Sequence, residues 1–271
     1  MFRLNKWMRK SCSAFAVFLV LCCSQANAFA DEILVAAAAD LSFAIKEIVA
    51  DFEKQSPHRV KLTLGSSGNF HSQIKNGAPF DVYFSADIQY PAELEKDGLT
   101  EPGTLFTYAV GRIVAWVPVK SPIDVEKLQM KAFFHPSVRK IAIANPEHAP
   151  YGRAAVSALQ HFGVYNQLKD KFVLGENISQ TAQFVDTGAA DIGIIALAIA
   201  IAPTVKERGK YWEIPLDAFP RMNQGAAILK AARDKGNLTA ARQFYDWIKS
   251  PSSQAILKRY GFFLPEAPAR N

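Results

Sequence analysis

The feature that most constrains the fold is a regular alternation of short apolar segments with longer amphipathic ones. The segment ILVAAA (33–38) has the length and composition of a buried strand, and LSFAIKEIVADFEKQ (41–55) carries apolar residues at helical spacing. The same order then recurs, with strands expected at 58–64 and 81–86 and a further helix at 90–96. Strands that alternate with helices predict an α/β layer built on a mainly parallel sheet.

A second set of such units follows along the chain. Four more strands are expected, at 112–119, 140–145, 171–177 and 191–198. A late strand at 225–230 precedes two terminal helices. This order predicts an α/β protein of two lobes joined by hinge crossover strands, each lobe a mainly parallel sheet flanked by helices. We place lobe 1 at 31–112 and 225–271, and lobe 2 at 113–224.

The N-terminal segment 1–30 has the three parts of a signal peptide. Four of the first ten residues are basic and none is acidic, and AFAVFLVL (14–21) is apolar but too short to span a bilayer. ANAFA then supplies the small residues that signal peptidase needs. Cleavage is expected after Ala28 or Ala30, and we prefer Ala30; an uncleaved membrane anchor is the alternative.

Removal of this segment changes how the composition is interpreted. All three cysteines lie in it, so the exported chain would depend on core burial without disulfides. A lipoprotein processed at Cys22 or Cys23 is a weaker alternative, since neither cysteine follows a small residue. Of 31 basic residues four are lost, which leaves 27 against 25 acidic ones, a net charge of +2. With no sustained basic stripe, nucleic acid is not an expected partner.

Small and polar residues gather where predicted strands lead into helices. Four junctions share this character: 37–42, 65–69, 148–153 and 175–179. Ligands of open α/β sheets bind at such strand ends, where helix N-termini present free N–H groups and a partial positive charge. With the hydroxyls of Ser66 and Ser67, these groups would form a donor cage for a compact anion, without lysine or arginine. Taken singly, each junction is more typical of ordinary capping than of ligand binding, with Asp40 as an N-cap.

Several segments resemble the periplasmic molybdate-binding proteins of bacterial ABC importers. They are AAAADLSFAIKEI, GSSGNFHSQIKNGAPFDVYFSAD, NPEHAPYGRAAVSAL, DIGII and IKSPSSQAILKRYGF, in the family's order over essentially the whole mature chain. The resemblance implies a two-lobed periplasmic binding protein that closes about a hinge on a tetrahedral dianion and grips it with neutral donors. It further implies a periplasmic monomer that delivers its ligand to an inner-membrane ABC permease powered by a cytoplasmic ATPase.

The resemblance also assigns candidate ligand-binding residues. Ser67 occupies the place of the family's second ligand serine, with Ser66 beside it. Tyr151 falls where family members supply an alanine or a tyrosine, and Ile178 where a backbone amide contributes. Two positions depart from the family pattern: Asp40 replaces a serine or threonine at the first junction, and Ala196 replaces a tyrosine that many members carry.

The carboxyl group of Asp40 leaves three interpretations open. An ionised carboxylate 4 Å from a dianion would cost roughly 4 kcal/mol per charge pair at an effective dielectric near 20. Asp40 could therefore cap its own helix and point away, or be protonated and donate to the anion. Alternatively, the ligand is another small solute, which a pocket enlarged at Ala196 would also favour.

An enzyme is the alternative from another functional class, as is a sensor module on the same scaffold. The mature chain lacks cysteine, G-x-S-x-G and G-x-x-x-x-G-K-[ST], and its histidines lack H-x-x-x-H spacing. We therefore expect no catalysis, no cofactor and no metal beyond the oxyanion. The leading ligand is molybdate, with tungstate as its companion.

Overall fold

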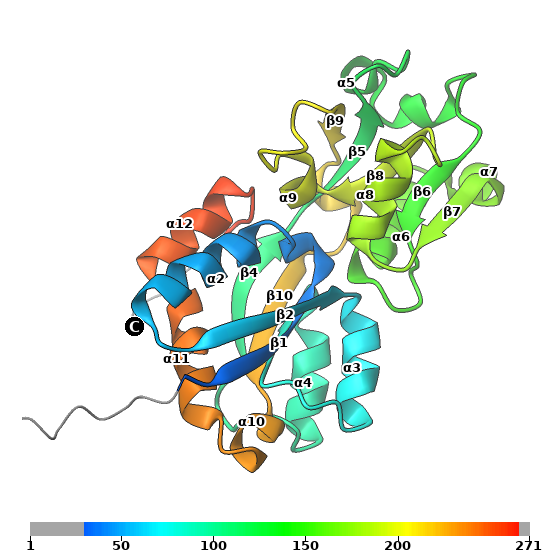
Figure 1. Ribbon diagram of the computed structural model, residues 1–271. Coiled ribbons are helices and arrows are strands. Elements are labelled where there is room, and N and C mark those ends of the chain that lie inside the picture. Colours follow the sequence, from blue (N-terminus) through cyan, green and yellow to red (C-terminus); the bar gives the residue numbers. More distant parts are fainter. Residues whose placement is uncertain (1–29, 266–271) are drawn as a thin grey trace, which may run out of the picture. The chain divides into compact units, whose positions relative to one another are not determined.

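The computed structural model describes residues 30–265, which form two five-stranded sheets flanked by helices (Figure 1). The predicted signal peptide lies outside the described residues. The first sheet has the strand order β2-β1-β3-β10-β4. Its strands are β1 (Glu32–Ala38), β2 (Arg59–Gly65), β3 (Val82–Ser85), β4 (Phe106–Gly111) and β10 (Met222–Ile228). We call this sheet and its helices the first lobe.

Alternating side chains of β1 explain why helices cover both faces of this sheet. Ile33, Val35 and Ala37 pack into one apolar cluster, which also contains side chains of several helices. Ala36 points the other way, into a second cluster that contains Phe70 and Ile74 of one helix and Leu94 of another. The first face carries α2 (Ala44–Gln55), α11 (Leu238–Ile248) and α12 (Pro251–Arg259). The second carries α3 (Ser67–Lys75) and α4 (Gln89–Lys96).

The second sheet has the strand order β7-β6-β8-β5-β9 and belongs to the second lobe. Its strands are β5 (Ile113–Pro118), β6 (Ile141–Ala144), β7 (Phe172–Gly175), β8 (Ile192–Ala196) and β9 (Gly209–Glu213). Helices α6 (Pro150–His161) and α8 (Ile178–Asp186) pack against these strands. Shorter helices are α5 (Val125–Leu128), α7 (Tyr165–Leu168), α9 (Leu197–Ala200) and, in the first lobe, α10 (Lys230–Asp234). Four 3₁₀ turns complete the set: η1 (Ala39–Leu41), η2 (Gln129–Phe134), η3 (Lys169–Lys171) and η4 (Leu216–Ala218).

The prediction of a two-lobed α/β fold is confirmed, and each sheet is mixed. In the first lobe β1 pairs in parallel with β2 and β3, whereas β10 is antiparallel to both β3 and β4. In the second lobe β5 is antiparallel to β8 and β9. The reason is the path of the chain, because β5 enters the second lobe and β10 re-enters the first. In the first lobe β10 therefore runs opposite to β3 and β4, whose carboxyl ends lie toward the second lobe. In the second lobe β5 runs opposite to β8, whose carboxyl end lies toward the first lobe.

Two segments connect the sheets, Arg112 between β4 and β5 and residues 214–221 between β9 and β10. The strands β4 and β9 were not expected from the sequence, and β10 begins earlier than the expected strand, at Met222.

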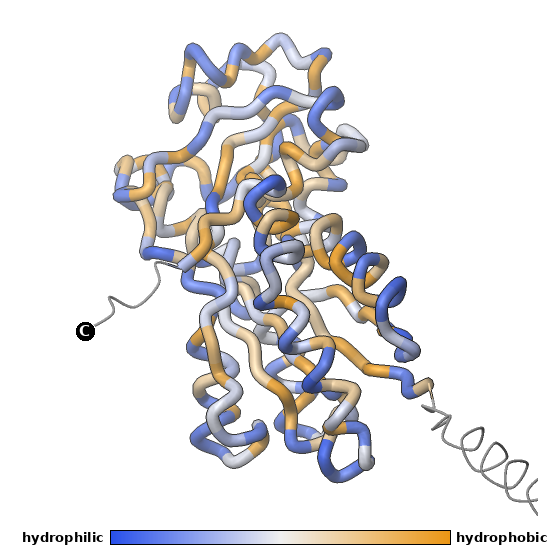
Figure 2. The backbone as a smooth tube through the Cα atoms, turned by 90° about the vertical axis from the view of Figure 1, so that its left-hand side faces the viewer, coloured by the Kyte–Doolittle hydropathy of each residue, from blue (hydrophilic) through white to orange (hydrophobic). Residues whose placement is uncertain are grey.

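Figure 2 shows mostly hydrophobic colour along the central strands and hydrophilic colour at many of the outer turns. Within residues 30–265, no helix has the length and apolar character needed to cross a membrane.

Candidate functional site

A small cavity lies where the junctions of the two lobes meet, and we call it the junction cavity. Its walls are formed by residues 38–40, 65–66, 149–151 and 177–178 and by Ala86. The first two ranges and Ala86 belong to the first lobe, and the other two begin helices of the second. The cavity encloses about 10 Å³ of free space, enough for roughly one water-sized sphere. All four junctions singled out in the sequence therefore converge here.

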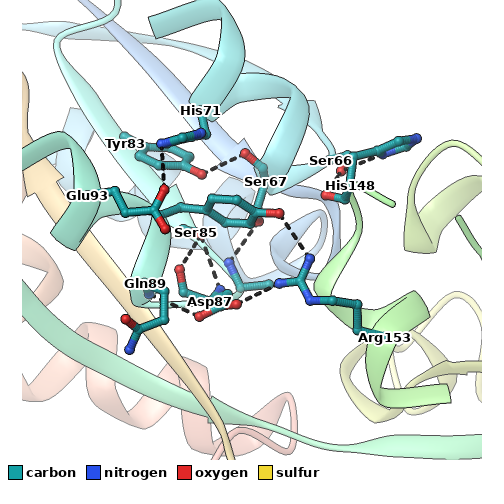
Figure 3. A network of polar contacts seen from close by, with 12 residues as sticks. Ser66, Ser67, His71, Tyr83, Ser85, Asp87, Gln89, Glu93, His148 and Arg153 are labelled. Atoms are coloured by element: carbon teal, nitrogen blue, oxygen red, sulfur yellow. Dashed lines mark hydrogen bonds and ion pairs between the residues drawn. The ribbon is translucent and has the colours of Figure 1, made fainter. Parts of the chain in front are cut away.

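Four of the five predicted site residues line this cavity, namely Asp40, Ser66, Tyr151 and Ile178. Ser67 does not line it, although it is buried directly beside Ser66. Its Oγ accepts a hydrogen bond of 2.9 Å from the N–H of Ala86 (Figure 3). Ser67 thus ties the start of α3 to the end of β3.

Asp40 occupies the centre of a buried polar network that joins both lobes. Its side chain is 1% exposed. Oδ2 accepts hydrogen bonds from the Tyr151 hydroxyl at 2.9 Å and from Gln224 Nε2 at 2.7 Å. Oδ1 is buried and has no hydrogen-bond partner. Burial raises the pKa of Asp40 to about 6, and hydrogen bonding from Gln224, from Tyr151 and from the backbone N–H groups of Asp40 and Leu41 partly offsets that rise.

The interpretation of Asp40 as an N-cap that points away from the ligand is wrong. Asp40 is the middle residue of η1, and no side-chain capping bond is formed there. The following helix α2 begins at Ala44, with Phe43 at its N-cap position. The carboxyl group instead faces the second lobe, because Tyr151 at the start of α6 supplies its hydroxyl.

Gln224 is a site residue that the sequence reasoning missed. It lies on β10, is fully buried, and its Oε1 accepts a 2.7 Å hydrogen bond from the Tyr108 hydroxyl. That bond orients the amide so that its Nε2 donates to Asp40. The residue is remote in sequence from all four junctions and carries no recognisable motif. A glutamine directly before the apolar segment GAAIL was the one available signal.

The start of α3 also contacts the second lobe. The Ser66 hydroxyl donates to the backbone carbonyl of His148 at 2.6 Å, and the N–H of Gly68 donates to the same oxygen at 2.9 Å. Nδ1 of His148 lies 3.0 Å from the Ser66 Oγ (Figure 3). At a neighbouring point, the Ser179 hydroxyl of α8 donates to the carbonyl of Ala39 at 2.8 Å. Backbone groups of the two lobes therefore lie in direct contact around the junction cavity.

An ion pair spans the lobes beside this contact. Arg153 of α6 places Nη2 2.6 Å from Asp87 Oδ2, and its Nη1 donates to the Tyr90 hydroxyl at 2.9 Å (Figure 3). Both partners belong to the first lobe. Arg153 also lines an adjoining groove of about 350 Å³, outside the junction cavity. The guanidinium group is thus committed to holding the lobes together, away from the candidate anion position.

Ala196 is the last residue of β8 and is fully buried. It does not line the junction cavity, so the enlargement expected from this alanine is not found there. Among residues 30–265, no group of three or more histidine, cysteine, aspartate or glutamate side chains is arranged to hold a metal ion.

Comparison with known proteins places this architecture in a family. The model of a family described as bacterial extracellular solute-binding protein matches residues 33–263. The molybdate-binding protein ModA of Azotobacter vinelandii is 38% identical over 253 residues, 93% of this chain and 96% of that protein. ModA of Rhodobacter capsulatus is 36% identical over 255 residues, 94% and 96% of the two chains.

Solved structures agree with this assignment. The Azotobacter vinelandii periplasmic molybdate-binding protein superposes with a TM-score of 0.80 at 36% identity, covering 86% of this chain and 100% of that one. The sulfate-binding protein SubI of Mycobacterium tuberculosis has a TM-score of 0.68 at 15% identity, covering 86% of each chain, and so shares the fold alone. The chain therefore belongs to the family of bacterial extracellular solute-binding proteins.

Proposed function

We propose that this chain captures molybdate in the periplasm for a bacterial ABC importer and acts by binding, without catalysis. The observation that carries the proposal is the identity of 38% and 36% to two molybdate-binding proteins over nearly their full length. The proposal includes a mature chain that starts at Asp31, a monomeric state, tungstate as a second ligand and an inner-membrane permease as the partner. The start at Asp31 rests on the signal-peptide pattern, and the other three rest on the family relationship.

The chemistry of the junction cavity supports an anionic ligand. The residues that line it include no lysine or arginine, and three helices of nine or more residues begin around it. The first N–H groups of α3, α6 and α8 have no acceptor within their own helices, apart from Pro150, which has no N–H. We assign the N–H groups of Tyr151 and Ile178 as donors to the anion's oxygens, while Ser66 lines the same cavity with its hydroxyl donated to the His148 carbonyl. Ser67 then supports this arrangement through its bond to Ala86.

Capture would proceed by closure of the lobes about the two connecting segments. Because the junction cavity is small, the lobes must separate to admit a tetrahedral anion. On closure, Ser66 and Gly68 contact His148, and Arg153 pairs with Asp87. These contacts form only when the lobes meet, so they favour the closed form that the permease would receive. We propose that Arg112 and residues 214–221 act as the hinge.

Thermal unfolding of the protein with molybdate, tungstate, sulfate or phosphate tests the proposal. A ligand at 1,000 times its dissociation constant adds about 4 kcal/mol to the free energy of unfolding. For a chain of this size that corresponds to a rise in Tm of roughly 10 °C. We expect such a rise with molybdate and tungstate and little with sulfate. An unchanged Tm with molybdate at millimolar concentration would contradict the proposal.

A further inference from the structure

One atom in the junction cavity lacks a partner, the Oδ1 of Asp40. Asp40 is 1% exposed and lines the cavity, and its other oxygen accepts the hydrogen bonds from Tyr151 and Gln224. A buried acceptor left without a donor is costly, and native structures contain few of them. The natural donor for this oxygen is therefore a group that arrives with the ligand.

We propose that the anion is bound together with one proton, which lies between Asp40 Oδ1 and an oxygen of the anion. This inference rests on the proposed function. An ionised Asp40 against a dianion would oppose binding by roughly 4 kcal/mol per charge pair. A proton taken from solvent removes that repulsion and converts the contact into a short O–H···O hydrogen bond. No other bond forms or breaks, and the proton returns to solvent when the anion leaves.

The surroundings of Asp40 favour the protonated form. Tyr151 from α6 and Gln224 from β10 contact its carboxyl group, and Tyr108 from β4 reaches it through Gln224. None of these three side chains is charged at neutral pH, since burial raises the pKa of both tyrosines well above the usual value. Burial likewise raises the pKa of Asp40 to about 6, and an adjacent dianion would raise it further.

The remaining wall residues carry no titratable side chain, and one such side chain lies just outside the cavity. From the first turn of α8 come Asn177 and Ile178, neither of which titrates. From the loop before α6 comes His148, whose Nδ1 lies 3.0 Å from the Ser66 Oγ. His148 is therefore the group that a test must distinguish from Asp40.

A shared proton also provides selectivity that cavity size alone does not. The more basic an oxyanion is, the more strongly it holds a proton placed between itself and a carboxylate. Molybdate and tungstate are stronger bases than sulfate, so the Asp40 contact favours them over sulfate. Neutral donors such as the N–H groups of Tyr151 and Ile178 do not discriminate in this way, because they donate a hydrogen bond without transferring a proton.

Calorimetric titration of the protein with molybdate, in buffers of different ionisation enthalpy between pH 7 and 8.5, measures the protons taken up. We expect about one proton per molybdate, and a dissociation constant that rises about tenfold per pH unit over this range. In D40N, whose amide donates without titrating, we expect no uptake and a dissociation constant independent of pH. The second variant, H148Q, removes the imidazole and keeps the backbone carbonyl that Ser66 and Gly68 contact, so the uptake per bound molybdate should stay near one whatever its affinity.

The possible outcomes separate this inference from the proposed function. Tight molybdate binding by the unmodified protein with no proton uptake would overturn the shared proton and leave the proposed function intact. Uptake that persists in D40N or disappears in H148Q would assign the proton to another group and overturn the role of Asp40. No molybdate binding at any pH would overturn the proposed function, and the inference with it. Because the uptake is measured on the unmodified protein, misfolding of a variant does not prevent the test.

Discussion

Substitution of Gly68 by alanine should weaken ligand binding without unfolding the protein. A Cβ at this position would lie 2.5 Å from the carbonyl oxygen of His148 and 2.9 Å from its Cα. Both atoms are backbone of the other lobe, so neither can move aside alone. Comfortable contact begins near ~3.5 Å, so the lobes must separate here by roughly 1 Å.

The size of the effect follows from the contacts that this separation breaks. The Gly68 N–H and the Ser66 hydroxyl both donate to the His148 carbonyl, at 2.9 and 2.6 Å. Each such bond contributes about 1 kcal/mol net, so the closed form should lose about 2 kcal/mol. Ligand held only in the closed form would then bind about 30-fold more weakly. Within the first lobe, alanine is a better helix former than glycine, and the contact to relieve there is with the end of the Tyr90 side chain, whose hydroxyl oxygen would lie 2.8 Å from the Cβ.

Calorimetric titration with molybdate measures the affinity, and small-angle X-ray scattering with saturating ligand measures closure. S72A is the matched control, since Ser72 is an exposed position of the same helix. We expect its affinity to equal that of the unmodified protein. If G68A instead binds molybdate with unchanged affinity and the same compact dimensions, the contact at His148 does not govern closure.

Two further predictions concern Arg153 and Asp40. R153M removes the interlobe ion pair between Arg153 and Asp87, whose side chains are 39% and 29% exposed. Because such exposed pairs are weak, the closed form should lose about 1 kcal/mol or less, and the affinity for molybdate should fall no more than about fivefold. The difference in affinity between R153M and the unmodified protein should shrink in high salt. The control K75M, which breaks the ion pair of Lys75 with Asp97 within the first lobe, should leave the affinity unchanged. With the lobes in contact, as in this structure, the pKa of Asp40 lies above its ordinary value of 3.8, so its stabilising contribution is complete below pH 3.8 and is lost as pH rises to about 6. D40N should therefore gain stability relative to the unmodified protein by about 3 kcal/mol between pH 4 and pH 8, and equal pH profiles in urea unfolding would contradict this.

The fold was accessible from the sequence because its strands are short and continuously apolar. ILVAAA and IAIA are buried on both faces, so their composition alone distinguishes them from the amphipathic helices between them. Strand β4, with sequence FTYAVG, and strand β9, with sequence GKYWE, lack this signal. They form because β10 and β5 lie alongside and offer unpaired backbone groups. Tertiary pairing of this kind leaves no local pattern.

The site was only partly accessible, for a different physical reason. Junction residues such as Ser66 and Tyr151 follow from the rule that ligands bind at the carboxyl ends of strands. Gln224 obeys no such rule, because it lies within a strand that returns from the other lobe. The orientation of the Asp40 carboxyl is equally hidden, since a side chain in a 3₁₀ turn can face either its own helix or the neighbouring lobe. Only the packed structure decides between the two.

The position of Gln224 and Tyr151 connects the protonation of Asp40 to closure of the lobes. Tyr151 comes from the second lobe, and Gln224 follows directly after the connecting segment 214–221. Gly111, the last residue before the other connection, packs so closely beneath them that a Cβ would lie 2.6 Å from the Tyr151 hydroxyl and 2.7 Å from Gln224 Nε2. Separation of the lobes would therefore remove Tyr151 and admit water to the carboxyl group. Since burial is the main cause of the raised pKa, opening should return it toward 3.8 and release the proton, so that closure, proton uptake and anion capture favour one another.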